Sequence, residues 1–147
     1  MRFALIVCLI GATAACRGSS AAPTPVSVDT TTNIAGNWNG TISSSNNATM
    51  QIGMALTQSG ADVSGTWNST SVRWEGQFSG AVRGSSVDGQ FMFTGMAADG
   101  TLCRGAATVT GTATASTMTL TSASGVVGPA CPAPLPIGLT IDVRRQS

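Results

Sequence analysis

Residues 33–69, NIAGNWNGTISSSNNATMQIGMALTQSGADVSGTWNS, decide the fold, because later segments repeat their pattern of glycine-spaced aromatic residues. In the first run, one parity holds Ile34, Trp38 and glycines, while the other parity is mostly asparagine and threonine. A run that is apolar on one side and polar on the other, with a period of two, indicates a β-strand with one buried face. Residues 48–58 and 63–67 repeat this pattern and predict two further strands.

Five later runs have the same period, and short turns rich in Gly, Ser, Asn or Asp separate most of them. They are residues 72–82, 87–93, 100–113, 118–120 and 137–143. Eight short strands without a helical period predict an all-β, antiparallel, up-and-down meander. Closing eight strands into a barrel buries the apolar face and removes both sheet edges. The alternative is a sandwich of two four-stranded sheets, but hairpin-length connections leave little room for its crossings.

The six aromatic residues after residue 32 all fall on the predicted inner face, and most have an inward glycine two residues away. We expect the core to contain Trp38, Met50, Ile52 and Met54. The candidate lumen or ligand-binding residues are Trp67, Trp74, Phe78, Phe91 and Phe93. Trp67 and Trp74 flank residues 68–73, so we expect both near one barrel end, half solvated and available to a ligand.

The N-terminus is typical of an export signal. Residues 1–15 carry Arg2, an apolar run and then small residues, which predicts a secretory signal peptide. The segment TAAC, residues 13–16, resembles a bacterial lipobox and implies lipid attachment at Cys16; simple cleavage after residue 15 is the alternative. Residues 17–32 are polar and contain proline, as in a flexible tether to a domain of residues 33–147. The predicted location is the bacterial cell envelope, lipid-anchored in the outer membrane, on its periplasmic or surface face.

The composition excludes several classes of function. Only 9% of the 147 residues are charged, the formal net charge is +1, and His, Tyr and Lys are absent. There is no basic patch for nucleic acid, and the usual general base and metal ligand are missing. Glu75 falls on the outward parity, and Asp62, Asp88 and Asp99 fall mostly at turns. We therefore expect no catalytic residues, no metal and no cofactor, and we predict that the protein is not an enzyme.

Cys103 and Cys131 are the remaining cysteines of the predicted domain, and secretion favours a structural disulfide between them. A metal or redox site would need further ligands or a CxxC spacing. Residues 125–136, GVVGPACPAPLP, contain too much proline for a strand. We expect this connection to fold over one barrel end, where the disulfide would hold it to the sixth strand.

Three short motifs, IAGNW at 34–38, MQI at 50–52 and VSGTW at 63–67, resemble the first strands of the avidin and streptavidin barrels. The chain also looks like small bacterial lipoproteins with a lipocalin- or avidin-like barrel. The resemblance implies the fold rather than an activity. Gly40 stands where the family has a biotin-binding Asn, and Trp67 where it has a Tyr, although residues 43–45 match its first-loop Ser. Biotin binding is therefore not expected.

Two functional hypotheses remain open. The first is a non-enzymatic, lipid-anchored envelope protein whose barrel binds a small apolar ligand or acts as a scaffold. The second is a protein-interaction module, for example a hydrolase inhibitor, acting through loops at residues 43–47 or 96–101. A ligand binder should have an open, aromatic-lined cavity, whereas an interaction module should have a filled barrel. The expected partners are a membrane, contacted through the N-terminal lipid, and either a small apolar ligand or a protein.

Overall fold

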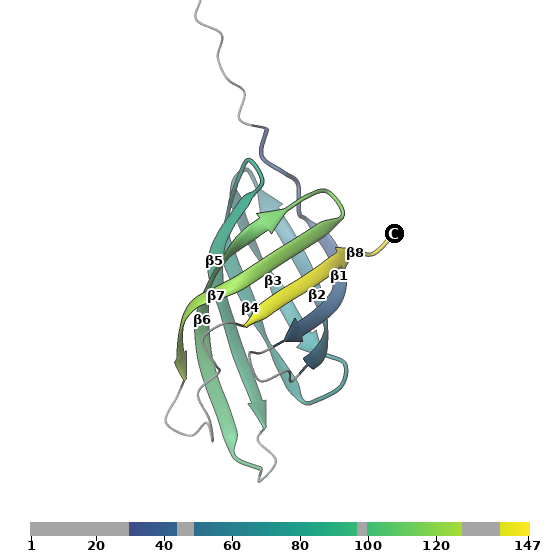
Figure 1. Ribbon diagram of the computed structural model, residues 1–147. Helices are drawn as coiled ribbons and strands as arrows, with labels where there is room; N and C mark the ends of the chain where they lie inside the picture. The colour runs from purple at the N-terminus through teal and green to yellow at the C-terminus, as the bar shows by residue number, and fades with distance from the viewer. Residues whose placement is uncertain (1–29, 44–48, 97–99, 128–138) are drawn as a thin grey trace, which may run out of the picture.

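The computed structural model describes residues 30–43, 49–96, 100–127 and 139–147, and it is a closed β-barrel (Figure 1). Each strand pairs antiparallel with the next, and β8 closes the barrel against β1. The eight strands are β1 (Gly36–Ser43), β2 (Thr49–Ser59), β3 (Asp62–Ser69), β4 (Trp74–Arg83), β5 (Ser86–Met96), β6 (Leu102–Ala113), β7 (Thr117–Val127) and β8 (Thr140–Arg145). The prediction of an eight-stranded meander barrel is confirmed, and the sandwich alternative is wrong.

Two tight hairpins at one end of the barrel set the register of four strands. Gly60 follows β2 with φ 61°, and Gly84 follows β4 with φ 59°. Each glycine is the first of two turn residues, as the pairs Ser59↔Asp62 and Arg83↔Ser86 show. Primed hairpin turns require a positive φ at this position, and glycine adopts it without steric cost. We call this end of the barrel, drawn at the top of Figure 1, the upper end.

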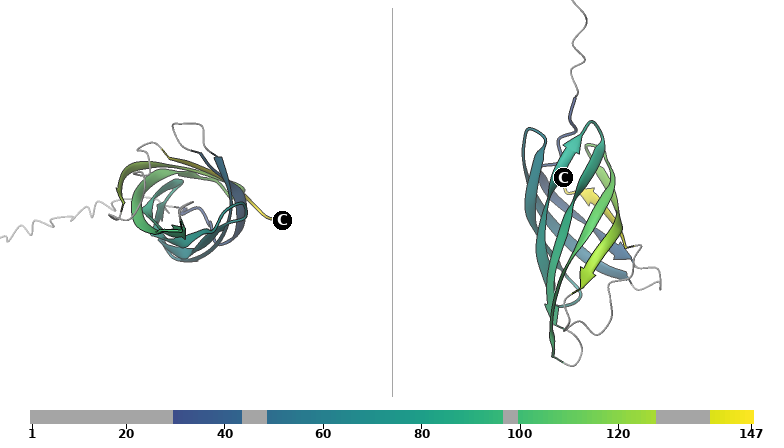
Figure 2. Two further views of the ribbon diagram at one scale, coloured as in Figure 1. Left: turned by 90° about the horizontal axis from the view of Figure 1, so that it is seen from below. Right: turned by 90° about the vertical axis from the view of Figure 1, so that its left-hand side faces the viewer.

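Large and small inward side chains alternate across neighbouring strands as well as along each strand, and the large ones in the described strands are mostly buried. Trp67 of β3 lies opposite Gly76 of β4, which in turn lies opposite Phe93 of β5. A Cβ atom added at Gly76 would lie 2.6 Å from the Trp67 Nε1 atom. A Cβ added at Gly89 would lie 2.9 Å from the Phe78 ring. Each ring therefore occupies the space that the glycine of the next strand leaves. Figure 2 shows the closed barrel end-on.

Residues 32–35 cross the upper end of the barrel, and we call them the strap. The Ile34 side chain is fully buried. The Gln58 side chain accepts a hydrogen bond from the Ile34 N–H at 2.7 Å and donates one to the Thr32 carbonyl at 3.2 Å. The Thr32 N–H donates to the Gly84 carbonyl at 2.8 Å. The strap is thus held to two separate upper turns, and Ile34 closes this end of the core.

Arg145, at the end of β8, joins the strap to the rest of the upper end. Its guanidinium donates hydrogen bonds to the carbonyls of Asn33, Ala35 and Ala115 at 2.5–2.6 Å. Its Cζ atom lies 4.8 Å from the centroid of the Trp38 ring, a cation–π geometry. The Trp38 indole N–H donates to the Ile34 carbonyl at 3.0 Å. Arg145 and Trp38 therefore both hold the strap against the upper end of the barrel.

Three details of the prediction are corrected. Residues 33–35 belong to the strap rather than to the first strand, because Gly36 turns the chain with φ 128° and side chains satisfy the strap's backbone. The seventh strand continues to Val127 and β8 begins at Thr140, so residues 125–127 are strand and the interval between the two strands is 128–139. Met50 is only partly buried, because it lies near the end of β2, whereas Trp38, Ile52 and Met54 are core as predicted.

Candidate functional site

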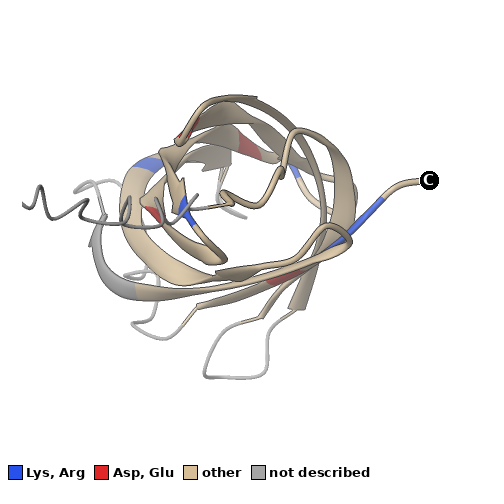
Figure 3. Ribbon diagram, turned by 90° about the horizontal axis from the view of Figure 1, so that it is seen from above, with Lys and Arg blue, Asp and Glu red and all other residues tan. Residues whose placement is uncertain are grey.

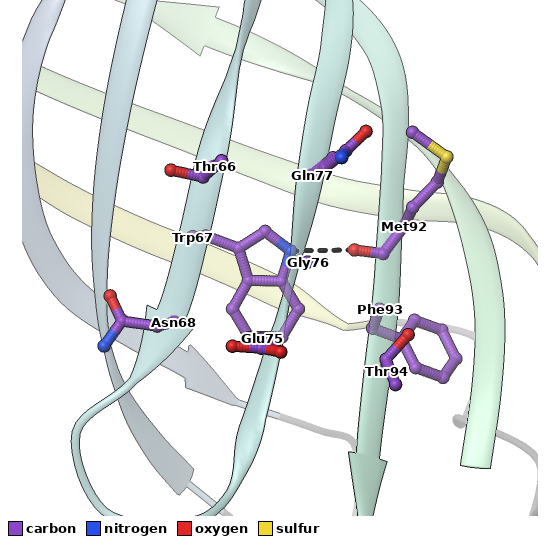
Figure 4. A pocket seen from close by; sticks show the side chains of 9 residues that line it. All are labelled: Thr66, Trp67, Asn68, Glu75, Gly76, Gln77, Met92, Phe93 and Thr94. Atoms are coloured by element: carbon purple, nitrogen blue, oxygen red, sulfur yellow. Dashed lines mark hydrogen bonds between the residues drawn. The ribbon is translucent and has the colours of Figure 1, made fainter. Parts of the chain in front are cut away.

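The aromatic side chains predicted to line a lumen pack against one another. Trp67 is 2% exposed, and its indole N–H donates to the Met92 carbonyl at 2.9 Å (Figure 4). Its ring stacks on Phe91 with a centroid distance of 4.4 Å and an interplanar angle of 22°. Phe78 and Phe93 are buried as well. These four residues form part of a packed core and do not present free ring faces to a ligand.

The expectation that Trp67 and Trp74 would both be half solvated is wrong for Trp67 and correct for Trp74. Trp67 lies one residue pair before the last β3–β4 pair, Asn68↔Glu75. The space beside Gly76 lets its ring reach β5. Trp74, the first residue of β4, is partly buried and stacks on Phe93 at 5.6 Å. It lies opposite Gly95, whose missing side chain leaves room for the indole.

The lower end of the barrel, opposite the strap, carries an apolar surface that we call the rim. The three large hydrophobic side chains exposed among the described residues are Val72 (49%), Met96 (45%) and Leu102 (44%). Met96 and Leu102 are paired across β5 and β6, and the Trp74 N–H donates to the Val72 carbonyl at 2.9 Å. The rim consists of these three residues and Trp74, which together line a hollow of about 430 Å³.

A second hollow, of about 570 Å³, lies over Gly76 on the wall of β3, β4 and β5 (Figure 4). Its lining mixes polar and apolar residues: Thr66, Asn68, Glu75, Gln77 and Thr94 contribute with Met92, Trp67 and Phe93. The two hollows share Asn68, Glu75 and Thr94, so they form a continuous surface from the rim onto the wall. Polar side chains therefore border the rim on this side.

Charged residues are few and lie scattered around the barrel wall (Figure 3). Glu75 is exposed on the outer wall, as predicted, and Asp62 and Asp88 are exposed near the upper turns. Among the described residues, no group of three His, Cys, Asp or Glu side chains could hold a metal ion. Asp99 lies outside the described residues, and within them no helix is long and apolar enough to cross a membrane.

Of the three cysteines with predicted roles, only Cys103 lies within the described residues. Cys103 is buried near the start of β6, at the lower end of the barrel, next to Leu102 of the rim. Cys131 and Cys16 lie outside the described residues. The disulfide between Cys103 and Cys131 and the lipid on Cys16 therefore stay predictions.

Sequence reasoning missed Arg145, Gln58 and Leu102. It named Met96 only as the first residue of a candidate interaction loop, and it placed Val72, which is exposed and precedes β4, in the fourth strand. A signal for part of the rim was available, since Met96 and Leu102 are large apolar residues on the mostly polar parity of their strands. No comparable signal identifies Arg145, because its role depends on carbonyl groups far away in the sequence.

No protein-family model, curated protein or solved structure matches this chain. The functional interpretation therefore depends on the residues and geometry described above.

Proposed function

We propose that this chain is a non-enzymatic, lipid-anchored protein of the bacterial cell envelope whose filled barrel presents the rim to a protein partner. One observation carries the proposal. The large inward aromatics are packed into the core, whereas Val72, Met96 and Leu102 are exposed together around the half-buried Trp74. Clustered exposed apolar side chains with a polar border are typical of protein interaction sites.

The composition of the rim also favours a protein partner. Aromatic residues, Met and Arg are enriched at protein interfaces, and Trp74 and Met96 lie beside the exposed Arg73. The exposed side chains project outward at the barrel end, whereas small-molecule sites enclose about 70–90% of their ligand. A protruding side chain of a partner protein fits such a surface better than an enclosed ligand does.

The non-enzymatic part of the proposal follows from the same geometry. Glu75, Asp62 and Asp88 are exposed and belong to different strands of the outer wall. Acid–base catalysis needs paired groups held on either side of a substrate, usually in a site that excludes water. We propose no metal or cofactor for this protein.

The related proposal concerns ancestry. The eight-stranded meander supports a relationship to the small bacterial lipoproteins with lipocalin- or avidin-like barrels, the family suggested by the motifs around Trp38 and Trp67. Biotin is not the proposed ligand. Trp67, which stands in place of a biotin-binding Tyr, is buried and uses its indole N–H within the core.

The anchor is tested by fractionating cells that express Cys16→Ser. We expect the variant to move from the membrane fraction into soluble periplasm or medium, because stable attachment requires the acyl chains on this cysteine. A Ser44→Ala variant serves as the control for expression and should stay with the membranes. If Cys16→Ser still sediments with membranes after a high-salt wash, the lipid is not the anchor.

The rim is tested with a photo-crosslinking amino acid at Ser71, which is exposed beside Val72. In cells, we expect a single protein adduct whose yield falls roughly tenfold in Leu102→Asp, because burying a new carboxylate in an apolar contact is unfavourable. Thr112→Asp, which adds the same charge at the exposed upper part of β6, should leave the adduct unchanged.

The stability of both variants is measured in parallel, and each should unfold within about 0.5 kcal/mol of the wild type, because both positions are exposed. Failure to form an adduct, or an equal yield in Leu102→Asp and Thr112→Asp, would reject the rim as the interaction surface.

One observation favours a second candidate function, the binding of a small apolar ligand at the same end. The hollow of about 430 Å³ beside Trp74 lies within the usual size range of ligand sites, about 300–1,000 Å³. In the crosslinking experiment, adducts with lipid or another small molecule, and none with protein, would favour this function.

A further inference from the structure

We infer that the membrane anchor and the rim lie at opposite poles of the barrel, so that the rim meets a protein partner located away from the anchoring membrane. This inference rests on the proposed function, since it needs both the lipid on Cys16 and the rim as an interaction surface. It adds the side from which the partner approaches.

The chain enters at the upper end, through the strap. The Thr32 N–H donates to the Gly84 carbonyl at 2.8 Å, and Gln58 bonds both Thr32 and Ile34. Arg145 bonds the carbonyls of Asn33 and Ala35. Because these bonds reach three separate elements, the strap cannot swing toward the rim without breaking the upper end of the core.

Strand β4 runs from one pole of the barrel to the other. β4 begins at Trp74 in the rim and ends at Arg83, which precedes Gly84, the residue bonded to Thr32. Its 10 residues extend about 30 Å along the strand at about 3.3 Å per residue, and a strand tilt of about 35–45° reduces this to roughly 20–25 Å along the barrel axis. The views in Figures 1 and 2 agree that the strap and the lower end of β4 lie at opposite ends of the barrel.

The predicted tether limits how far the upper pole can move from the membrane. Residues 17–31, if they behave as a flexible chain, have a root-mean-square span of about 20 Å. The upper pole should therefore stay close to the lipid surface, with the rim roughly 20–25 Å beyond it. A partner at the rim is thus expected to be a protein in the space beyond the membrane rather than lipid of the anchoring leaflet.

The chemistry at the rim specifies what this partner should present. Val72, Met96 and Leu102 offer apolar contact, and the exposed Arg73 beside them carries a guanidinium that forms bidentate bonds with carboxylates. A matching partner surface has a protruding apolar side chain next to an Asp or Glu.

The orientation is tested by energy transfer on vesicles. The full chain, recovered from membranes, is reconstituted into vesicles whose headgroups carry an acceptor dye, with a donor dye at either Ser71 or Ser85. Both serines are exposed, Ser71 beside the rim and Ser85 in the upper turn after Gly84. We expect roughly twofold higher transfer from Ser85, because the two positions are separated by roughly 20–25 Å along the barrel axis.

Equal transfer from the two positions, or higher transfer from Ser71, would overturn the inference by placing the rim at the membrane. Absence of transfer from both would also overturn it, since no anchor would then hold either pole near the lipid. The Cys16→Ser fractionation and the Leu102→Asp crosslinking report separately on the proposed function. The crosslinking can fail while the transfer ratio stays as expected, whereas loss of the lipid anchor removes transfer from both positions, so the failures are distinguishable.

Discussion

Replacing Trp38 by alanine should destabilise the barrel by about 3–5 kcal/mol and should leave much of the protein unfolded at moderate urea concentration. Trp38 is fully buried, and its indole contacts the strap residue Ile34. The substitution removes its packing, its hydrogen bond to the Ile34 carbonyl and the ring beneath the Arg145 guanidinium. The measurement is a urea melt followed by circular dichroism, which does not depend on tryptophan fluorescence.

The matched control is Asn39→Ala, the next residue in β1, which is exposed. It should change the free energy of unfolding by less than about 0.5 kcal/mol. A loss below about 1 kcal/mol for Trp38→Ala would show that the strap and Arg145 do not depend on the indole, contrary to the packing described above.

The second large effect is expected at Trp67, where the structure changes the sequence-based prediction. The half-solvated position predicted from the sequence would make alanine cost about 1–2 kcal/mol. Because Trp67 is 2% exposed and stacks on Phe91, we now expect about 3–5 kcal/mol for Trp67→Ala. The urea midpoint is the measurement.

Two companion variants separate the sources of this effect. Trp67→Phe keeps most of the buried ring but removes the N–H that donates to the Met92 carbonyl, so about 1–2 kcal/mol should be lost. Trp74→Ala should also cost only about 1–2 kcal/mol, because Trp74 is partly exposed. If Trp67→Ala and Trp74→Ala cost the same, the distinction between core and rim would be wrong.

The strands could be predicted from the sequence because burial of one face imposes a period of two on every strand. The inward placement of Phe78, Phe91 and Phe93 followed directly from this period. The turns at Gly60 and Gly84 were equally readable, because local backbone geometry determines the residue type there. These features depend on neighbours in the chain, which a sequence displays.

The strap and the degree of burial of each tryptophan depend on residues far apart in the chain. Arg145 reaches Asn33 across 112 positions, and Trp67 reaches Met92 across 25. The alternation within a strand predicted an inward Trp67, but only the cross-strand pairing with Gly76 explains how its ring fits within the core. The parity of Met96 and Leu102 signals exposure, but only the structure shows that Val72 and Trp74 lie beside them.

The central claim is that the barrel is a solid scaffold and that its interaction surface is the rim. Titration of the folded protein with the apolar fluorescent probe N-phenyl-1-naphthylamine tests this claim most directly. We expect no saturable one-to-one binding that survives the Leu102→Asp substitution, because the inward aromatic rings fill one another's space. Saturable one-to-one binding that persists in Leu102→Asp and disappears in Trp67→Phe would place a ligand inside the barrel and contradict the account.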